Sequence, residues 1–165
     1  MAGNAAGASI PCEGYRGHMA SNPTLVDLMA KGLNAVHRSL LTVSGGRIGA
    51  TARGMQVVEL HTTGRTSGQR RSVMLTAPIY EPDRIVLVAS KNGDDRNPDW
   101  YRNLVAQPHI EVTEAGATRP MQARTASAEE KAEMWPAIVA ANKGYASYQR
   151  RTEREIPVVI CEPRT

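Results

Sequence analysis

Six short apolar runs, rich in β-branched residues, follow one another along the chain from residue 55. Glycine, proline, asparagine and aspartate separate them, as in residues 81–83, which is the pattern of strands joined by turns. The runs do not alternate regularly with helices, which disfavours a doubly wound parallel sheet. Closing such a sheet removes its unpaired edges. We therefore predict a mainly β fold with flanking helices (α+β) and a small closed sheet of six antiparallel strands: residues 55–62, 72–80, 84–90, 109–114, 119–126 and 156–161.

The segment before these strands predicts an amphipathic helix over residues 22–42. Asn22 is a good N-cap and Pro23 suits the first helical position. Apolar residues then recur at spacings of three and four. This helix packs on the domain or, alternatively, lies on a membrane surface. Residues 1–21 are small and polar and end in a sequence that cloning sites encode, so we expect a flexible leader derived in part from an expression vector.

Two further helices are predicted between the strands. Asn97 and Pro98 repeat the signature of an N-cap followed by a first-turn proline, and this short helix should stop before Pro108. Residues 127–130 (Ser-Ala-Glu-Glu) form a capping box for the next helix. Pro136 lies inside that helix and should kink it or mark a restart.

The composition fits one domain over residues 22–165. The chain has 165 residues, of which 41% are hydrophobic, and it contains no phenylalanine, so its few tryptophans and tyrosines are informative. A net charge of +4 permits an anionic ligand, lipid or nucleic acid as partner. Cys12 and Cys161 form no disulfide framework, which fits a reducing cytoplasm. No apolar run approaches about 18 residues, so no membrane-spanning helix is expected.

The loop over residues 61–71 (HTTGRTSGQRR) has the composition of an anion site. Gly64 and Gly68 let the backbone turn sharply and approach a ligand. Three arginines and several hydroxyl groups supply donors that match phosphate or carboxylate oxygens. The spacing is not that of a Walker loop, and a strand follows rather than a helix. A solvated basic hairpin turn is the alternative.

A second loop, over residues 90–104, leads from a buried strand into a helix N-terminus, which also favours an anion. Trp100 and Tyr101 follow at once, so a flat aromatic ligand could stack there, although Trp100 could instead be a core anchor. Tyr145 and Tyr148 share one helix face and either close the core or line a pocket. Together the two loops suggest a ligand with a planar ring at one end and negative charge at the other.

Several kinds of active site are not indicated. The four histidines have no metal-ligand spacing, so no metal site is predicted, and there is no nucleophile elbow. The difficult chemistry of an enzyme of this kind would come from a cofactor.

Ordered motifs between residues 55 and 163 resemble the deazaflavin-dependent nitroreductase and quinone reductase family of actinobacteria. They are T-x-G-R-x-S-G in residues 62–68, S-K-x-G in residues 90–93, P-x-W-Y-x-N-L in residues 98–104, and Y-Q followed by T-x-R-x-I-P in residues 148–157. The resemblance implies a split β-barrel, similar to that of flavin-binding reductases, and coenzyme F-420, an 8-hydroxy-5-deazaflavin.

The resemblance also implies a role for each loop. The first loop should hold the phosphate and acidic tail of the coenzyme through Thr62, Thr63, Gly64, Arg65, Ser67, Gly68, Arg70 and Arg71. The second loop should lie alongside the ring and linker of the coenzyme, at Val88, Ala89, Ser90, Lys91, Asn92 and Gly93. The groove should be lined by Pro98, Trp100, Tyr101 and Asn103. Substrate should meet Ser72, Tyr145 and Tyr148. Relatives commonly have glycine where Asn92 stands, and asparagine tolerates positive φ better than most residues.

The implied reaction is hydride transfer from the reduced deazaflavin to a quinone, an enone or a nitroaromatic. The catalytic hypothesis is that Ser90 or Tyr145 donates a hydrogen bond to the oxyanion that develops on the acceptor. An FMN-dependent reductase on the same barrel and a non-catalytic deazaflavin-binding protein are the alternatives. No nucleic-acid partner is expected. The resemblance implies a cytoplasmic monomer, with peripheral contact between the N-terminal helix and the inner face of the membrane.

Overall fold

The computed structural model describes residues 51–52 and 54–164. The predicted leader (residues 1–21), the predicted amphipathic helix (residues 22–42) and Cys12 lie outside the described residues. Within the described part of the chain, no helix is both long and apolar enough to cross a membrane.

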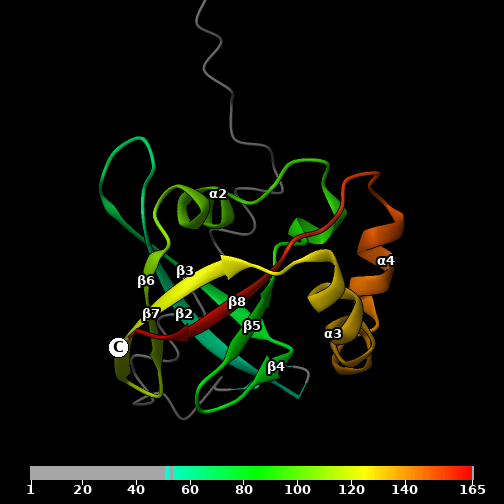
Figure 1. Cartoon of the computed structure of the whole chain (residues 1–165), viewed down its shortest axis with the longest axis horizontal. Coiled ribbons are helices and arrows are strands. Elements are labelled where there is room, and N and C mark those ends of the chain that lie inside the picture. The colour runs from blue at the N-terminus through cyan, green and yellow to red at the C-terminus, as the bar shows by residue number, and fades with distance from the viewer. Residues whose placement is uncertain (1–50, 53, 165) are drawn as a thin grey trace, which may run out of the picture.

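The strands form one curved antiparallel sheet, as predicted (Figure 1). They are β1 (Thr51–Ala52), β2 (Met55–Thr63), β3 (Arg70–Ala77), β4 (Ile79–Tyr80), β5 (Ile85–Val88), β6 (His109–Glu114), β7 (Ala117–Thr125) and β8 (Val158–Pro163). Their order is β1-β2-β6-β7-β8-β5-β4, and β3 pairs with β2. β3 also lies against β5, so the two ends of the curved sheet meet and close a barrel.

All six predicted strands are present, but one is divided and one short strand is added, so the sheet of the described residues has eight strands. The run predicted over residues 72–80 begins earlier, because Arg70 and Arg71 pair with Thr63 and Thr62 of β2. It is also divided into β3 and β4 at Pro78, a residue that cannot donate a ladder hydrogen bond. The two-residue strand β1 was not predicted, since only its pairing with β2 makes it a strand.

The barrel interior is filled by aliphatic side chains, as expected for a chain without phenylalanine. Leu60, Leu87, Val112 and Met121 are fully buried there, and Trp100 closes one end. A second buried cluster, between the sheet and the last two helices, contains Met55, Val86, Val88, Ile138, Tyr145, Ile156 and Val158. Apolar burial is the main favourable term in folding, so these two clusters fix the barrel and the helices on it.

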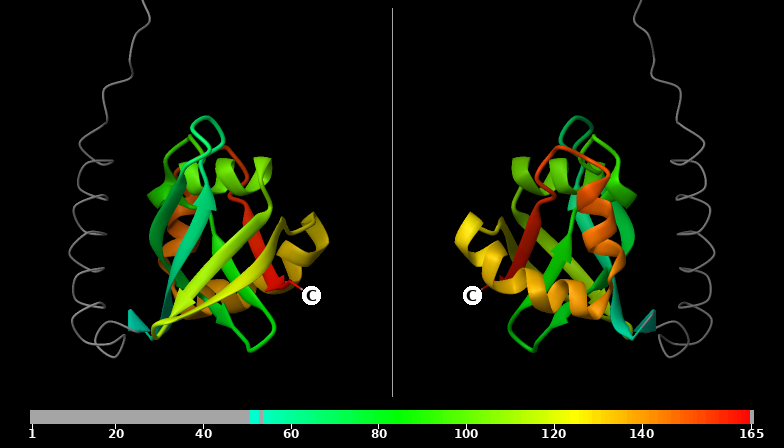
Figure 2. Two further views of the ribbon diagram at one scale, coloured as in Figure 1. Left: turned by 90° about the vertical axis from the view of Figure 1, so that its left-hand side faces the viewer. Right: turned by 90° about the vertical axis from the view of Figure 1, so that its right-hand side faces the viewer.

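In the described part of the chain, three α-helices and one 3-10 turn surround the barrel: α2 (Asp99–Ala106), α3 (Ala128–Ala141), α4 (Gly144–Arg150) and η1 (Lys91–Gly93). In the side views α2 covers one end of the barrel, and α4 stands beside the wall that contains β3 and β5 (Figure 2). The capping box of α3 is confirmed, since Ser127 Oγ accepts from the Glu130 N–H and the Glu130 carboxylate accepts from the Ser127 N–H. Pro136 neither divides nor ends α3.

The predicted cap of α2 is wrong by one residue. Pro98 occupies the N-cap position and the helix begins at Asp99, with no side-chain hydrogen bond at the cap. The reason is that Asn97 Oδ1 accepts a hydrogen bond of 2.8 Å from Arg154 Nη1. The helix does end before Pro108, as predicted.

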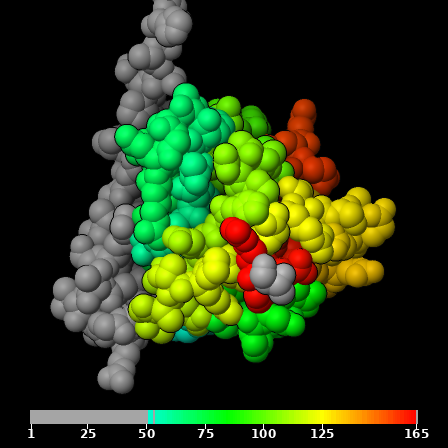
Figure 3. Space-filling model, turned by 60° about the vertical axis from the view of Figure 1, so that its left-hand side comes forward, coloured from blue at the N-terminus to red at the C-terminus, as the bar shows by residue number. Residues whose placement is uncertain are grey.

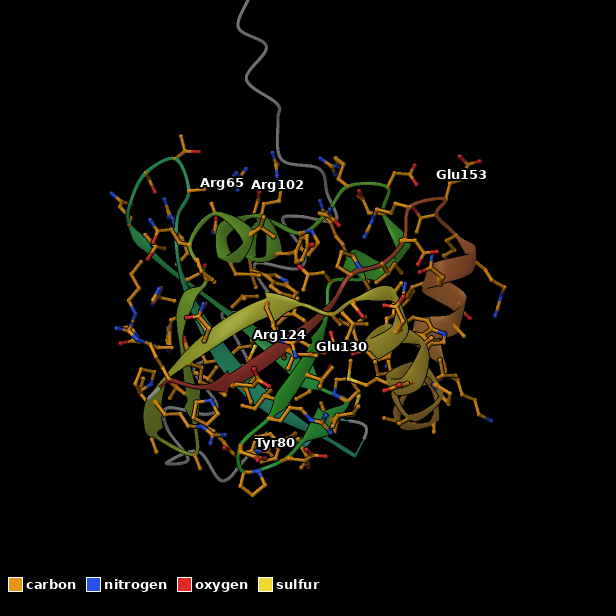
Figure 4. The ribbon with its side chains drawn as sticks, viewed as in Figure 1. Arg65, Tyr80, Arg102, Arg124, Glu130 and Glu153 are labelled. Carbon is orange, nitrogen blue, oxygen red and sulfur yellow. The ribbon has the colours of Figure 1, made fainter. Side chains whose placement is uncertain are left out.

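The strand directions place the two predicted anion loops at the same end of the barrel. The β2–β3 hairpin, η1 and α2 lie together at the upper end in Figure 1, and the β4–β5 turn lies at the opposite end. In Figure 4, Arg65 and Arg102 lie at the upper end, whereas Tyr80 lies at the lower end. We refer to the first as the loop end of the barrel.

Candidate functional site

The β2–β3 hairpin is a compact turn held by its own backbone. The Gly64 N–H donates to the Gln69 carbonyl over 2.8 Å, and the Gly68 N–H donates to the Gly64 carbonyl over 2.7 Å. Gly68 has φ of +66°, which favours glycine. A Cβ on Gly64 would lie 2.7 Å from Ser67 Oγ and 3.6 Å from Arg71 Cγ. The absence of a side chain at Gly64 thus lets the turn close and keeps Arg71 against it.

Arg65 ties the hairpin to α2. Its backbone N–H and its Nη1 both donate to Asn103 Oδ1 over 3.2 Å, and Nη1 also donates to Asp99 Oδ1 over 3.3 Å. Asn103 Nδ2 in turn donates to the buried Thr62 Oγ1 over 3.3 Å. In the space-filling view the surface of β2 and β3 adjoins that of α2 without a break (Figure 3). Arg65 and Asn103 therefore act as structural links within the predicted site.

The other two hairpin arginines differ in their surroundings. Arg70 Nη2 donates to Glu111 Oε2 over 2.6 Å, so its charge is partly neutralised. Arg71 is exposed and has no carboxylate at ion-pair distance among the described residues. Both line a cavity of about 470 Å³ with His61 and Ser72. Arg71 is thus the hairpin guanidinium best placed to bind an anion.

The second predicted loop contains an unusual backbone turn. Lys91, Asn92 and Gly93 have φ of +46°, +57° and +84° in succession. Asn92 thus has the positive φ that asparagine tolerates better than most residues. The Gly93 N–H donates to the Ser90 carbonyl over 2.9 Å and the Asp94 N–H donates to the Lys91 carbonyl over 3.1 Å. Left-handed conformations are costly for residues with a side chain, so the surrounding structure must hold this turn in place.

Asp94 and Arg96 follow the turn as a close ion pair. The Arg96 backbone N–H donates to Asp94 Oδ1 over 2.8 Å and its guanidinium donates to both carboxylate oxygens over 3.1 Å. These bonds, with the charge of Lys91 in addition, lower the pKa of Asp94 from 3.8 to about 2. Asp94 is therefore ionised at neutral pH, and its charge is matched by the two cations beside it.

Arg154 holds the second loop through hydrogen bonds to its backbone. Its Nη2 donates to the carbonyls of Ala89 and Ser90 over 3.1 and 2.9 Å, and its Nε donates to the Asp94 carbonyl over 2.9 Å. Thr152 Oγ1 donates to Asp95 Oδ1 over 2.8 Å from the same segment. Both Thr152 and Arg154 belong to the T-x-R-x-I-P motif, which the sequence indicated without giving these residues a role.

The two tyrosines of α4 occupy different environments. The rings of Tyr145 and Tyr148 meet edge to face with centroids 6.2 Å apart. Tyr145 is only 5% exposed, and its hydroxyl lies 3.2 Å from Thr76 Oγ1 of β3. Burial raises the pKa of Tyr145, so the hydroxyl keeps its proton at neutral pH and can donate. Tyr145 thus closes the second core cluster, whereas Tyr148 is half-buried.

Of the predicted groove residues, Pro98, Trp100 and Asn103 are more buried than a groove lining requires. Trp100 is 9% exposed and belongs to the barrel core, so it is a core anchor in this structure. Val88 and Ala89 are buried as well, and the Ala89 carbonyl accepts from Arg154. Tyr101 is half-buried and its hydroxyl lies 3.1 Å from Thr125 Oγ1.

Most of the predicted residues therefore lie at the loop end of the barrel. Hydrogen bonds from two side chains hold the loops that carry them. The hairpin is fixed to α2 through Asn103, and η1 is fixed to the segment after α4 through Arg154. A Cβ on Gly93 would lie 2.9 Å from the Tyr148 carbonyl, so η1 also packs directly on α4. Residues 51–52 and 54–164 contain no cluster of side chains that could hold a metal ion.

The loop end fits an anionic cofactor by the chemistry of its donors. The exposed Arg71 guanidinium supplies hydrogen-bond donors beside one of the two tight turns. Consecutive backbone N–H groups in turns that contain left-handed residues form concave anion sites.

Comparison with known proteins agrees with the family resemblance of the sequence motifs. Residues 35–163 match the family described as F420H(2)-dependent quinone reductase. A Mycobacterium tuberculosis protein with that description is 36% identical over 136 residues, which cover 78% of this chain and 89% of that protein.

Two solved structures are also similar. An F-420-H2-dependent reductase (FDR-A) is 39% identical with a TM-score of 0.58, over 64% of this chain and 93% of that one. A domain-swapped dimer is 33% identical with a TM-score of 0.60, over 79% and 99% of the two chains, and its assembly differs from the monomer that we expected here. This chain belongs to the family of quinone reductases that depend on reduced coenzyme F-420, and its fold is the split β-barrel of those reductases.

Proposed function

We propose that this protein transfers a hydride from reduced coenzyme F-420 to a quinone bound at the loop end of the barrel. The observation that carries the proposal is the pair of tight turns, one beside the exposed Arg71 and one at residues 91–93, at one end of a barrel of this family. The FMN alternative finds no support in the comparisons.

The binding residues act by position and charge. Arg71 and the hairpin backbone would hold the negatively charged end of the coenzyme, and the turn at residues 91–93 would receive the part nearer the ring. When bound, the reduced deazaflavin supplies a hydride from C5. Quinone, hydride and one proton together give the hydroquinone, and solvent is the proton source.

Tyr145 and Ser90 are the candidates for stabilising the oxygen that becomes negative on the acceptor. The Tyr145 hydroxyl keeps its proton, so it is a competent donor once it exchanges Thr76 for the acceptor oxygen. Ser90 lies at the start of the left-handed turn. If Tyr145→Phe and Ser90→Ala both leave the single-turnover hydride rate unchanged, this catalytic assignment is wrong.

The cofactor is tested by binding. Purified protein is titrated with oxidised coenzyme F-420 and, separately, with FMN, followed by fluorescence. We expect saturation by the deazaflavin and a dissociation constant that rises at least about tenfold in Arg71→Ala, from loss of a charge-assisted contact. The matched control is Arg84→Ala, because Arg84 pairs with Glu81 in the β4–β5 turn at the opposite end of the barrel.

Turnover separates the remaining alternatives. A reductase oxidises the reduced coenzyme when menadione is added, whereas a carrier protein binds it without turnover. Enones and nitroaromatics are assayed in parallel, since the same hydride chemistry could serve them. Saturation by FMN alone would overturn the cofactor, and binding of neither would overturn the proposed function.

A further inference from the structure

One arginine makes four hydrogen bonds to the loop that leads from β5 to α2. Arg154 Nη2 donates to two successive carbonyls, those of Ala89 and Ser90, over 3.1 and 2.9 Å. Its Nε donates to the Asp94 carbonyl over 2.9 Å, and its Nη1 donates to Asn97 Oδ1 over 2.8 Å. The guanidinium thus joins the two ends of residues 89–97, the segment that contains the left-handed turn.

These contacts bear directly on the conformation of the turn. Positive φ at Lys91 and Asn92 is disfavoured by the contact between Cβ and the backbone, so neighbouring bonds must stabilise it. The Ser90 carbonyl accepts from both Arg154 Nη2 and the Gly93 N–H, and the latter bond closes the turn. Loss of the guanidinium would leave this carbonyl and that of Ala89 short of donors and let the turn relax.

The planar shape of the side chain matters as well as its charge. All four acceptors of Arg154 are neutral, and no carboxylate lies at ion-pair distance among the residues that the structure describes. Burial lowers the pKa of Arg154, and the charges of Asp94 and Asp95 oppose that shift. A lysine would keep the charge, but its three donors on one nitrogen cannot match four acceptors arranged around a fork.

We propose that Arg154 is a positioning residue that holds the Lys91–Gly93 turn in its left-handed form and thereby sets the affinity for the coenzyme. The inference rests on the proposed function for its effect on binding. Its effect on the turn is independent of any ligand, so the two can fail separately.

The first test is amide hydrogen exchange at Gly93 and Asp94 in the ligand-free protein. Arg154→Met and Arg154→Lys should both raise the exchange rates of these two amides at least about tenfold, because each loses the fork that holds the Ser90 carbonyl. Arg154→Lys keeps the alkyl chain and charge, and it provides the folded variant where Arg154→Met does not fold. The matched control is Arg150→Met, because Arg150 is exposed and donates to Ser147 Oγ on its own helix.

The second test separates positioning from general loss of structure. In Arg154→Lys we expect the dissociation constant for oxidised coenzyme F-420 to rise on the order of tenfold, while kcat at saturating coenzyme and KM for menadione stay within about threefold. Unchanged amide exchange in both Arg154 variants would overturn the proposal. Wild-type exchange and affinity in Arg154→Lys would do the same, because charge alone would then suffice. If the wild type binds no deazaflavin, the proposed function fails and amide exchange alone decides the role of Arg154.

Discussion

Asn103 Oδ1 accepts two hydrogen bonds from Arg65, one from the backbone N–H and one from Nη1, each of 3.2 Å. The same amide donates through Nδ2 to the buried Thr62 Oγ1, so both of its polar atoms are used. One side chain of α2 therefore sets both the end of β2 and the start of the hairpin turn. The geometry of a ligand-binding hairpin depends here on a residue 38 positions away in the sequence.

Removing the Asn103 amide should free the hairpin. Asn103→Ala leaves the Arg65 N–H and the Thr62 hydroxyl without these partners in a half-buried region, so we expect a loss of about 1–3 kcal/mol in unfolding free energy. Urea denaturation measures it, and coenzyme affinity should fall as well. Arg102→Ala is the control on the same helix, since Arg102 is exposed and its ion-pair partner among the described residues is Asp99, at 3.8 Å. Equal stability of the two variants would contradict the structural role of Asn103.

Gly93 and Gly116 allow backbone strain to be separated from steric contact. Their φ values are +84° and +85°, so alanine at either position should lower the unfolding free energy by about 1–2 kcal/mol through the left-handed backbone conformation. A Cβ on Gly93 would also lie 2.9 Å from the Tyr148 carbonyl and from Arg151 Cβ, whereas one on Gly116 meets nothing within 4 Å. We expect Gly93→Ala to cost about 1–3 kcal/mol more in unfolding free energy than Gly116→Ala. Equal losses in thermal or urea denaturation would show that α4 does not press on this turn.

The strands were predictable because each apolar run specifies its own buried face. The closing of the sheet followed from their number and antiparallel order. The ends of the elements were less predictable, because they depend on partners elsewhere in the chain. Asn97 has the ideal residue type for a helix cap, but Arg154, which is 57 residues away, takes its side-chain oxygen. Local propensity cannot anticipate such a competition.

In the candidate site too, some features were predictable from the sequence and others were not. The two loops were recognised from their glycines and basic residues, and the structure places them at one end of the barrel. Which residues support the loops could not be read from the sequence. Trp100 was predicted either to stack on a ring or to anchor the core, and it lies in the core. Arg154 belonged to a recognised motif, but no role was assigned to it from the sequence. Burial and hydrogen-bond geometry decide these roles, and both depend on the tertiary fold.

The Asp94–Arg96 pair predicts a pH dependence at the acid end. The pKa of Asp94 is about 2 in the folded protein against an ordinary 3.8, chiefly because of the hydrogen bonds from Arg96. A lowered folded pKa means that the stabilisation is complete above about pH 4 and is lost as pH falls toward 2. In Arg96→Ala, carboxyl NMR should show Asp94 titrating nearer 3.8, and unfolding free energy should depend less on pH between 4 and 2. Arg150→Ala serves as control, and an unmoved Asp94 titration in Arg96→Ala would rule out this pairing in solution.

The contact between Tyr145 and Thr76 connects α4 to β3 and can be measured as a coupling. Their hydroxyl oxygens lie 3.2 Å apart, and Tyr145 is almost fully buried. Tyr145→Phe and Thr76→Val should each lower the unfolding free energy by about 0.5–1.5 kcal/mol, because each leaves the other hydroxyl without this bond. The double variant should then lose less than the sum of the two, since no unpaired partner remains at this contact. Urea denaturation of the four proteins gives the coupling directly. Tyr148→Phe is the control on the same helix. Strict additivity would mean that the two hydroxyls do not bond in solution, and Tyr145 would then already be free to donate to an acceptor.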